Sequence, residues 1–116
     1  MGDTKHHLKI AREKRIGASQ EFKSGRHSNV ADLALKAVEQ AIEAEAARDG
    51  MHFHLRPRTA HSERRDWLKS KYPTLSIHFE ALWSAYGDLG YDGLNGKRAK
   101  EAIEAMEAIF RGLSAD

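Results

Sequence analysis

Two stretches of the chain repeat apolar residues with the period of an α-helix, and they restrict the possible folds more than any other feature. In the first stretch these residues are Val30, Leu33, Ala34, Ala37, Val38, Ala41 and Ile42. In the second they are Ala99, Ala102, Ile103, Met106, Ile109, Phe110 and Leu113. Spacings of three and four place each set on one face of a helix. Such a face must be covered by another helix, so the sequence predicts a helical bundle.

The N-terminal part predicts a less regular helix over residues 5–23. Its apolar side consists of Leu8, Ala11, Ala18 and Phe22. Arg15 falls on the same side, and we expect its stem to lie along the edge of the core with its charged head in solvent. Ser28 or Asn29 can cap the second helix, and Asp49-Gly50 can end it. The outward residues of that helix are predicted to be Lys36, Glu39, Gln40 and Glu43.

The middle of the chain predicts two further helices. Thr59 or Ser62 can cap a short helix that Pro73 ends after Tyr72, because the residue before a proline avoids helical geometry. Thr74 can cap the next helix, whose buried face would be Leu75, Phe79, Leu82, Trp83 and Tyr86. The following segment YGDLGYDGLNG, residues 86–96, is rich in glycine and predicts a loop. We therefore expect one domain over residues 1–116, an all-α, up-and-down bundle of four or five helices.

Composition narrows the classes of function. The chain has 116 residues and no cysteine, which excludes disulfides, thiolate zinc sites and cysteine nucleophiles. It has no apolar run long enough to span a membrane, and charges lie where a signal peptide needs apolar residues, so a soluble, cytoplasmic protein is expected. The net charge is +2, with local positive charge at residues 5–14 and 56–65. That distribution permits an acidic partner such as RNA, although a solvated helical surface looks much the same.

The segment Met51–Trp67, MHFHLRPRTAHSERRDW, is the first place to look for a chemical site. We expect a ligand to meet its basic residues and two tyrosines farther along the chain. These candidates are His52, His54, Arg56, Arg58, His61, Arg65, Tyr86 and Tyr91. Arg56 and His61 also have an Arg-x4-His spacing, which makes them candidates for catalysis. The alternative is that Arg56 and Arg58 are solvated loop residues, with His61 packed at the start of a helix.

The order of the elements resembles the HEPN domain (higher eukaryote and prokaryote nucleotide-binding). The resemblance covers roughly residues 5–113 and rests on SGRHSNVADLALKAVEQAIEAEAARDG, a short helix that bears His61, an aromatic turn, and GKRAKEAIEAMEAIF. It implies a helical bundle, commonly a homodimer, that is involved with RNA or nucleotides. Many members are toxins of toxin–antitoxin pairs, and a nucleotidyltransferase partner is one possibility the resemblance raises.

The catalytic members of that family are metal-independent ribonucleases that use an Arg-x4-6-His motif near the last long helix. Histidine transfers a proton there, and arginine stabilises charge on the phosphorane. The matching segment of this chain is Leu82–Tyr91, LWSAYGDLGY. If Tyr91 takes the place of the histidine, the arginine positions hold Ser84, Ala85 and Tyr86. The family's ribonuclease site is therefore expected to be absent here.

A metal site is an alternative interpretation of the histidines. His52 and His54 alternate, so an extended segment would place both rings on one side, and His61 could complete three nitrogen ligands for zinc. No recognised ligand spacing accompanies them, and we expect neither a metal nor another cofactor. His6 and His7 are expected to be exposed.

Together these patterns predict a non-catalytic, HEPN-like binding or regulatory module for a nucleotide, RNA or a protein partner. Aromatic residues beside positive charge can stack on nucleobases, although at helical spacing they more often fill a core or a dimer interface. Two other classes stay open. One is a metal-independent ribonuclease that uses Arg56 and His61, and the other is an assembly protein without a ligand.

Overall fold

The computed structural model of the chain describes residues 2–91 and 96–115, with side chains described for residues 4–87 and 96–115. Within these ranges the regular elements are all helical, as predicted, and no strand occurs. The elements are α1 (Gly2–Lys23), α2 (His27–Ala47), the short 3-10 turn η1 (Phe53–Leu55), α3 (Ala60–Lys71), α4 (Pro73–Tyr91) and α5 (Gly96–Gly112).

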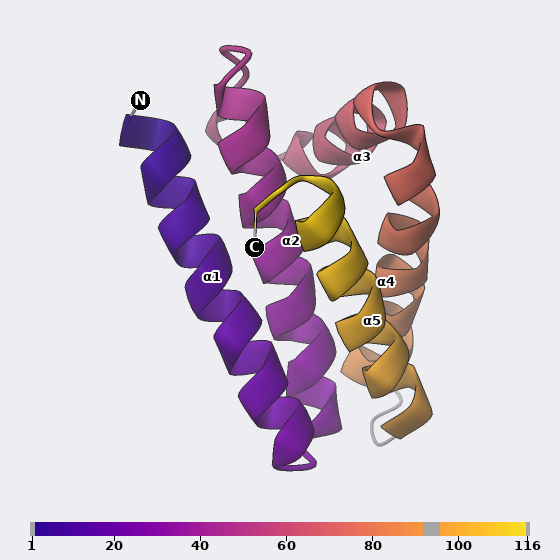
Figure 1. Cartoon of the computed structure of the whole chain (residues 1–116). Helices are drawn as coiled ribbons and strands as arrows, with labels where there is room; N and C mark the ends of the chain where they lie inside the picture. The colour runs from indigo at the N-terminus through magenta and orange to yellow at the C-terminus, as the bar shows by residue number, and fades with distance from the viewer. Residues whose placement is uncertain (1, 92–95, 116) are drawn as a thin grey trace.

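The four long helices alternate in direction, and α3 lies across one end of them (Figure 1). Helices α2 and α5 lie between α1 on one side and α4 on the other, and α2 contacts α1, α3, α4 and α5. The molecule measures 39 × 25 × 23 Å along its principal axes. The expected up-and-down arrangement thus describes α1, α2, α4 and α5.

The core is built around α2. Its predicted apolar stripe is buried, with only Leu33 partly accessible, and Ala31, Leu35, Ala44 and Ala46 are buried as well. Alanine side chains are small enough to let neighbouring helices approach closely. As a result α2 has almost no solvent-exposed face near its C-terminal end. Polar residues in that part of the helix are therefore buried or half-buried.

Glycines follow the ends of the first two helices, and Gly50 was predicted to do so. Gly25 and Gly50 have φ of +76° and +77°, a left-handed conformation that favours glycine. Beyond Gly50 the amide of Met51 donates to the carbonyl of Ala46 at 3.0 Å, which satisfies one of the last carbonyls of α2. The predicted start of α2 is less accurate, because the helix begins at His27 and Arg26 makes no side-chain cap.

The predicted loop at residues 86–96 is wrong over its first half. Helix α4 continues through Gly87 and Gly90 and ends at Tyr91, and residues 92–95 lie outside the described part of the chain. Each glycine costs a helix roughly 1 kcal/mol relative to alanine. Packing of Leu82 and Ala85, both fully buried in the core beside α5, offsets that cost. The helix also begins at Pro73, since proline suits the first position of a helix.

None of the helices in the described ranges combines the length and apolar character required to cross a membrane.

Candidate functional site

The histidine- and arginine-rich segment does not form a single site. His54, in η1, contacts α2. His61, in the first turn of α3, lies against α4. Arg58 and Arg65 are exposed, and His52 is half-buried with its ring centroid 6.1 Å from that of His54. The predicted candidates therefore divide into two groups, one around a buried carboxylate and one around an exposed ring.

The buried carboxylate belongs to Glu43, which the sequence had predicted to face solvent. The residue is only 1% exposed because η1 and α3 close over the end of α2. One oxygen, Oε1, accepts from the backbone amide of His54 at 3.3 Å and from its ring Nδ1 at 3.0 Å. The other oxygen, Oε2, accepts from Nε of Arg64 at 2.7 Å. We call the group formed by Glu43, His54, Arg64 and His7 the buried polar centre.

His7 joins this centre from α1. It was expected to be exposed but is 5% exposed, because α1 packs antiparallel to α2 (Figure 1). Its Nδ1 lies 2.7 Å from Oε1 of Gln40, and one turn earlier Thr4 donates to the carbonyl of Ala44. The ring centroids of His7 and His54 are 4.7 Å apart. Residues of α1, η1 and α3 thus meet around Glu43 of α2.

Charge is balanced inside the centre by contacts to Glu43. Burial raises the pKa of this carboxyl group, but hydrogen bonds from His54 and Arg64 and the charge of Arg64 outweigh burial and hold the pKa below its ordinary value. Glu43 is therefore an ionised acceptor, and Nδ1 of His54 is the donor. A buried carboxylate without such partners would be strongly destabilising.

A second carboxylate connects the two groups. Glu39, one turn before Glu43, accepts from Arg64 at 3.3 Å and from Nδ1 of His61 at 3.3 Å. His61 then stacks on Trp83, with ring centroids 3.9 Å apart and an interplanar angle of 26°. The hydrogen-bonded chain from Glu43 through Arg64 and Glu39 therefore orients the ring of His61 against α4.

The rings of His61, Trp83 and Tyr86 form what we call the aromatic stack. Trp83 and Tyr86 are one turn apart on α4, with centroids 5.4 Å apart and an interplanar angle of 22°. Trp83 is 38% exposed, although its position on the apolar stripe predicted burial. Tyr86 is half-buried, and the side chain of the other tyrosine candidate, Tyr91, lies outside the described residues.

Arg56 and His61, the predicted catalytic pair, have different partners. Arg56 donates from Nε to Glu63 at 3.0 Å and lines a shallow groove of about 450 Å³ beside Trp67. His61 lines no part of that groove and contacts Glu39 and Trp83 instead. The two side chains are held by separate hydrogen bonds to Glu63 and Glu39 and do not form a shared phosphate site in this arrangement.

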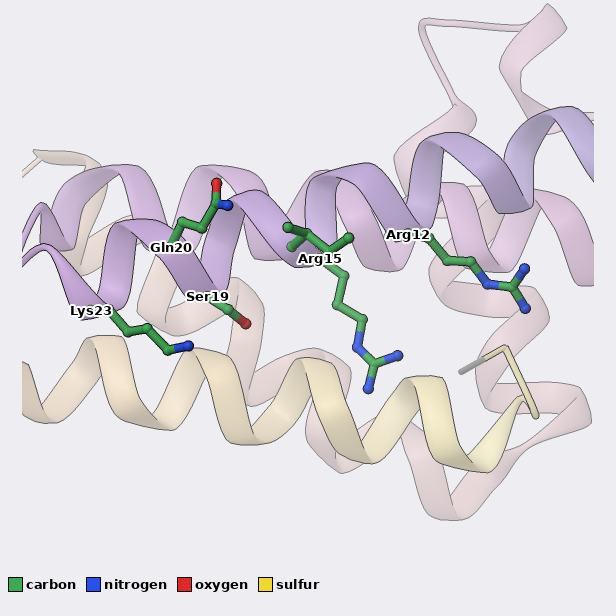
Figure 2. A pocket seen from close by; sticks show the side chains of 6 residues that line it. Arg12, Arg15, Ser19, Gln20 and Lys23 are labelled. Carbon is green, nitrogen blue, oxygen red and sulfur yellow. The ribbon is translucent and has the colours of Figure 1, made fainter.

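A larger groove, of about 490 Å³, lies along α1 on the side of α5, and no candidate from the sequence lines it. Figure 2 shows Arg12, Arg15 and Lys23 extending from α1 toward α5. Arg15 forms two hydrogen bonds with Glu107, at 2.6 and 3.0 Å, and its guanidinium lies 5.0 Å from the ring centroid of Phe110. The head expected in solvent is thus bound to α5. This basic groove offers cations but no exposed ring.

Sequence reasoning missed His7 and Glu43, although both left a signal. His7 stands four residues before Ala11 and eleven before Ala18, on the buried side of the first helix. Glu43 lies within AIEAEAA, where apolar residues flank both glutamates. A helix that buries its alanines on all sides leaves no solvent face for a carboxylate.

Comparison of the chain with models of protein families, with curated proteins and with solved structures finds no match.

Proposed function

We propose that this protein is a non-catalytic binding module for a ligand that carries a nucleobase, a nucleotide or a single-stranded segment of RNA. The observation that carries the proposal is the aromatic stack of His61, Trp83 and Tyr86, with Trp83 38% exposed. Trp83 lies between the other two rings, so its accessible area belongs to an ordered aromatic surface, and such a surface can receive another flat ring.

The energetics of stacking support this choice. One base on an aromatic side chain contributes about 1–3 kcal/mol, and the contact tolerates any base because every base has a π-face. The stack is ordered before a ligand arrives, because His61 is held by Glu39. Ordering in the free protein lowers the entropy that binding must remove.

Positive charge close to the stack supports a phosphate-bearing ligand. Arg98, in the first turn of α5, donates to Oγ of Ser84 at 2.7 Å and to Oε2 of Glu101 at 2.6 Å, and Ser84 follows Trp83 directly. Lys97 precedes it at the N-terminal end of α5, where the helix dipole also favours an anion. On α3, the exposed Arg65 lies one turn after His61. These cations would meet the phosphate of a nucleotide whose base extends the stack.

The resemblance to HEPN domains is part of the proposal, and the helical bundle supports it. Binding rather than cleavage is favoured because Arg56 is paired with Glu63 and His61 with Glu39. The ribonuclease alternative would need both pairs to open.

The homodimer expected from the resemblance is also proposed. Ile77 on α4 is 74% exposed and Ala81, one turn later, is exposed as well, which offers an apolar strip for a second copy. A protein that stays monomeric by light scattering at micromolar concentration would refute the dimer. If the protein instead binds a different protein, the partner that the resemblance suggests is a nucleotidyltransferase.

Fluorescence of Trp83 tests the binding function directly. The chain has two tryptophans, and the other, Trp67, is buried, so a Trp67→Phe variant reports on Trp83 alone. Adenosine monophosphate and a short single-stranded RNA are titrated separately in the presence of a chelator. We expect saturable quenching, and Trp83→Leu in the native background should weaken binding, measured by calorimetry, about 10- to 100-fold.

The matched control removes positive charge from the other side of the molecule. Arg12 lines the basic groove on α1, and α2 and α5 separate α1 from α4 (Figure 1). Arg12→Gln should therefore change the affinity for the nucleotide or RNA less than about threefold. Equal losses in both variants would show non-specific attraction to phosphate. Cleavage of the RNA that disappears in Arg56→Ala and in His61→Ala would replace this proposal with the ribonuclease alternative.

A further inference from the structure

We propose that His7, Glu43 and His54 form a binding site for a divalent transition-metal ion of the zinc type. Each of the three residues offers one ligand atom, and these atoms lie within 4.8 Å of one another. They come from α1, α2 and η1, so the site exists only in the folded chain. The site differs from the three-histidine arrangement that the sequence suggested, since only His54 is common to both.

The chemistry of the three groups suits such an ion. Two imidazole nitrogens and one carboxylate oxygen are a donor set that zinc and related ions accept, whereas calcium and magnesium prefer oxygen ligands alone. Oε1 of Glu43 and Nδ1 of His54 are already 3.0 Å apart. Adjacent ligands of tetrahedral zinc are roughly 3.3 Å apart, given metal–ligand distances of about 2.0–2.1 Å. The third atom needs to move by no more than about 1.5 Å, a side-chain adjustment.

The residues around the three ligands are those that orient ligands in metal sites. Gln40 accepts a hydrogen bond from Nδ1 of His7, which leaves the lone pair of a neutral ring on Nε2. Arg64 holds the second oxygen of Glu43, so that Oε1 is presented toward His54. Metal-ligating histidines and carboxylates ordinarily have such partners, which fix the ring and the free oxygen before the ion binds.

Local charge also favours a cation. Two carboxylates, Glu39 and Glu43, share one cation, Arg64, so with neutral histidines these three groups sum to −1.

Binding would require a proton to change place on one ring. Nδ1 of His54 carries the proton donated to Glu43, so a metal bound at Nδ1 takes its lone pair while a proton is bound at Nε2. The side chain of His54 is 36% exposed, and water can carry the proton between the two nitrogens. For a ring that carries one proton, this exchange leaves the number of protons unchanged.

The test titrates chelator-treated protein with Zn²⁺ by calorimetry and with Co²⁺ by its visible absorption. We expect one ion per chain in both titrations. His54→Gln should weaken Zn²⁺ binding by roughly 100-fold or more, because even partners outside the ligand set contribute about 10- to 100-fold. Gln40→Leu, which leaves all three ligands in place, should weaken binding about 10-fold.

The matched control is His78→Gln, which removes a half-buried histidine of α4 that is not one of the three ligands. The Zn²⁺ affinity of this variant should equal that of the unmodified protein within about twofold, because His78 is outside the group of ligand atoms. Absence of saturable binding, or equal losses in His78→Gln and His54→Gln, would overturn the proposal. Circular dichroism confirms that each variant is folded, and Gln40→Leu decides the question if His54→Gln is not. The metal proposal does not rest on nucleobase binding, because none of its three ligands belongs to the aromatic stack, so either proposal can fail alone.

Discussion

The buried polar centre and the aromatic stack take their histidines from the same short segment but give them opposite environments. His54 meets an ionised carboxylate that is 1% exposed, on a helix packed on several sides. His61, seven residues later, meets a half-buried carboxylate and an indole that is 38% exposed. In the first region the histidine stabilises a charge that water cannot reach, and in the second it orders a ring that water can reach.

This difference shows that residue type alone does not define a site in this molecule. A cluster of histidines and arginines suggested one ligand site, yet the chain passes from η1 to α3 between them and turns them to different neighbours. Burial makes the polar centre suited to a small ion and sensitive to the loss of any partner. Exposure makes the stack suited to a flat ligand. Substitutions in the stack should therefore destabilise the fold less than substitutions in the buried polar centre.

The largest predicted effect is on stability and concerns Glu43. In the presence of a chelator, Glu43→Ala should lower the free energy of unfolding by about 3 kcal/mol, because it opens a cavity and leaves Arg64 with one carboxylate. Urea denaturation measures this loss. Glu80→Ala, at an exposed position of α4, is the control and should change stability by less than about 0.5 kcal/mol. A loss below about 1 kcal/mol in Glu43→Ala would mean that the centre is not a stabilising network.

The next effect concerns salt and separates the two regions by exposure. RNA bound at the stack should lose affinity as salt rises, with a slope of about −0.7 in the logarithm for each phosphate contacted. Two contacts give roughly a sevenfold loss between about 50 and 200 mM salt. Stability conferred by Glu43 should change little over the same range, since buried pairs are screened weakly. Binding that is insensitive to salt would contradict the phosphate contacts proposed for Arg98.

A smaller effect is expected when the stack is disrupted. Trp83→Leu should cost about 1 kcal/mol of stability, the size of one aromatic contact. Thermal unfolding in the absence of ligand measures it, with Trp67→Phe as a comparison in the buried core. A loss above about 3 kcal/mol would indicate that Trp83 belongs to the core, and its accessible ring would then have no special role.

The smallest effect belongs to the ion pair in the basic groove. The side chains of Arg15 and Glu107 are 26% and 34% exposed, so their coupling should be about 0.2–1 kcal/mol in a double-mutant cycle. The same cycle on Arg64 and Glu43, with side chains 13% and 0% exposed, should give a clearly larger value. Equal couplings would show that burial does not distinguish the two pairs.

Much of the fold was predictable from the sequence because α2 and α5 repeat apolar residues at helical spacing. That argument assumes one buried face per helix, and it failed for Glu43 because α2 is covered by four other helices. It failed at Gly87 and Gly90 because local preference for a loop is weaker than the packing of α4 against α5. His54 and His61 were found by their residue type. Their partners Glu43 and Glu39 could not be assigned from the sequence. The path of the chain after Gly50 decides which residues meet, and that path depends on packing between helices and not on the local sequence.

The central claim is that the aromatic stack is the ligand-binding surface, and an amide NMR titration with a short single-stranded RNA tests it most directly. We predict that the largest shifts fall on the indole N–H of Trp83 and on the amides of His61, Ser84 and Tyr86, with little change at His7 and Glu43. Shifts centred on Arg12, Arg15 and Lys23, or no shifts at saturating RNA, would contradict the account.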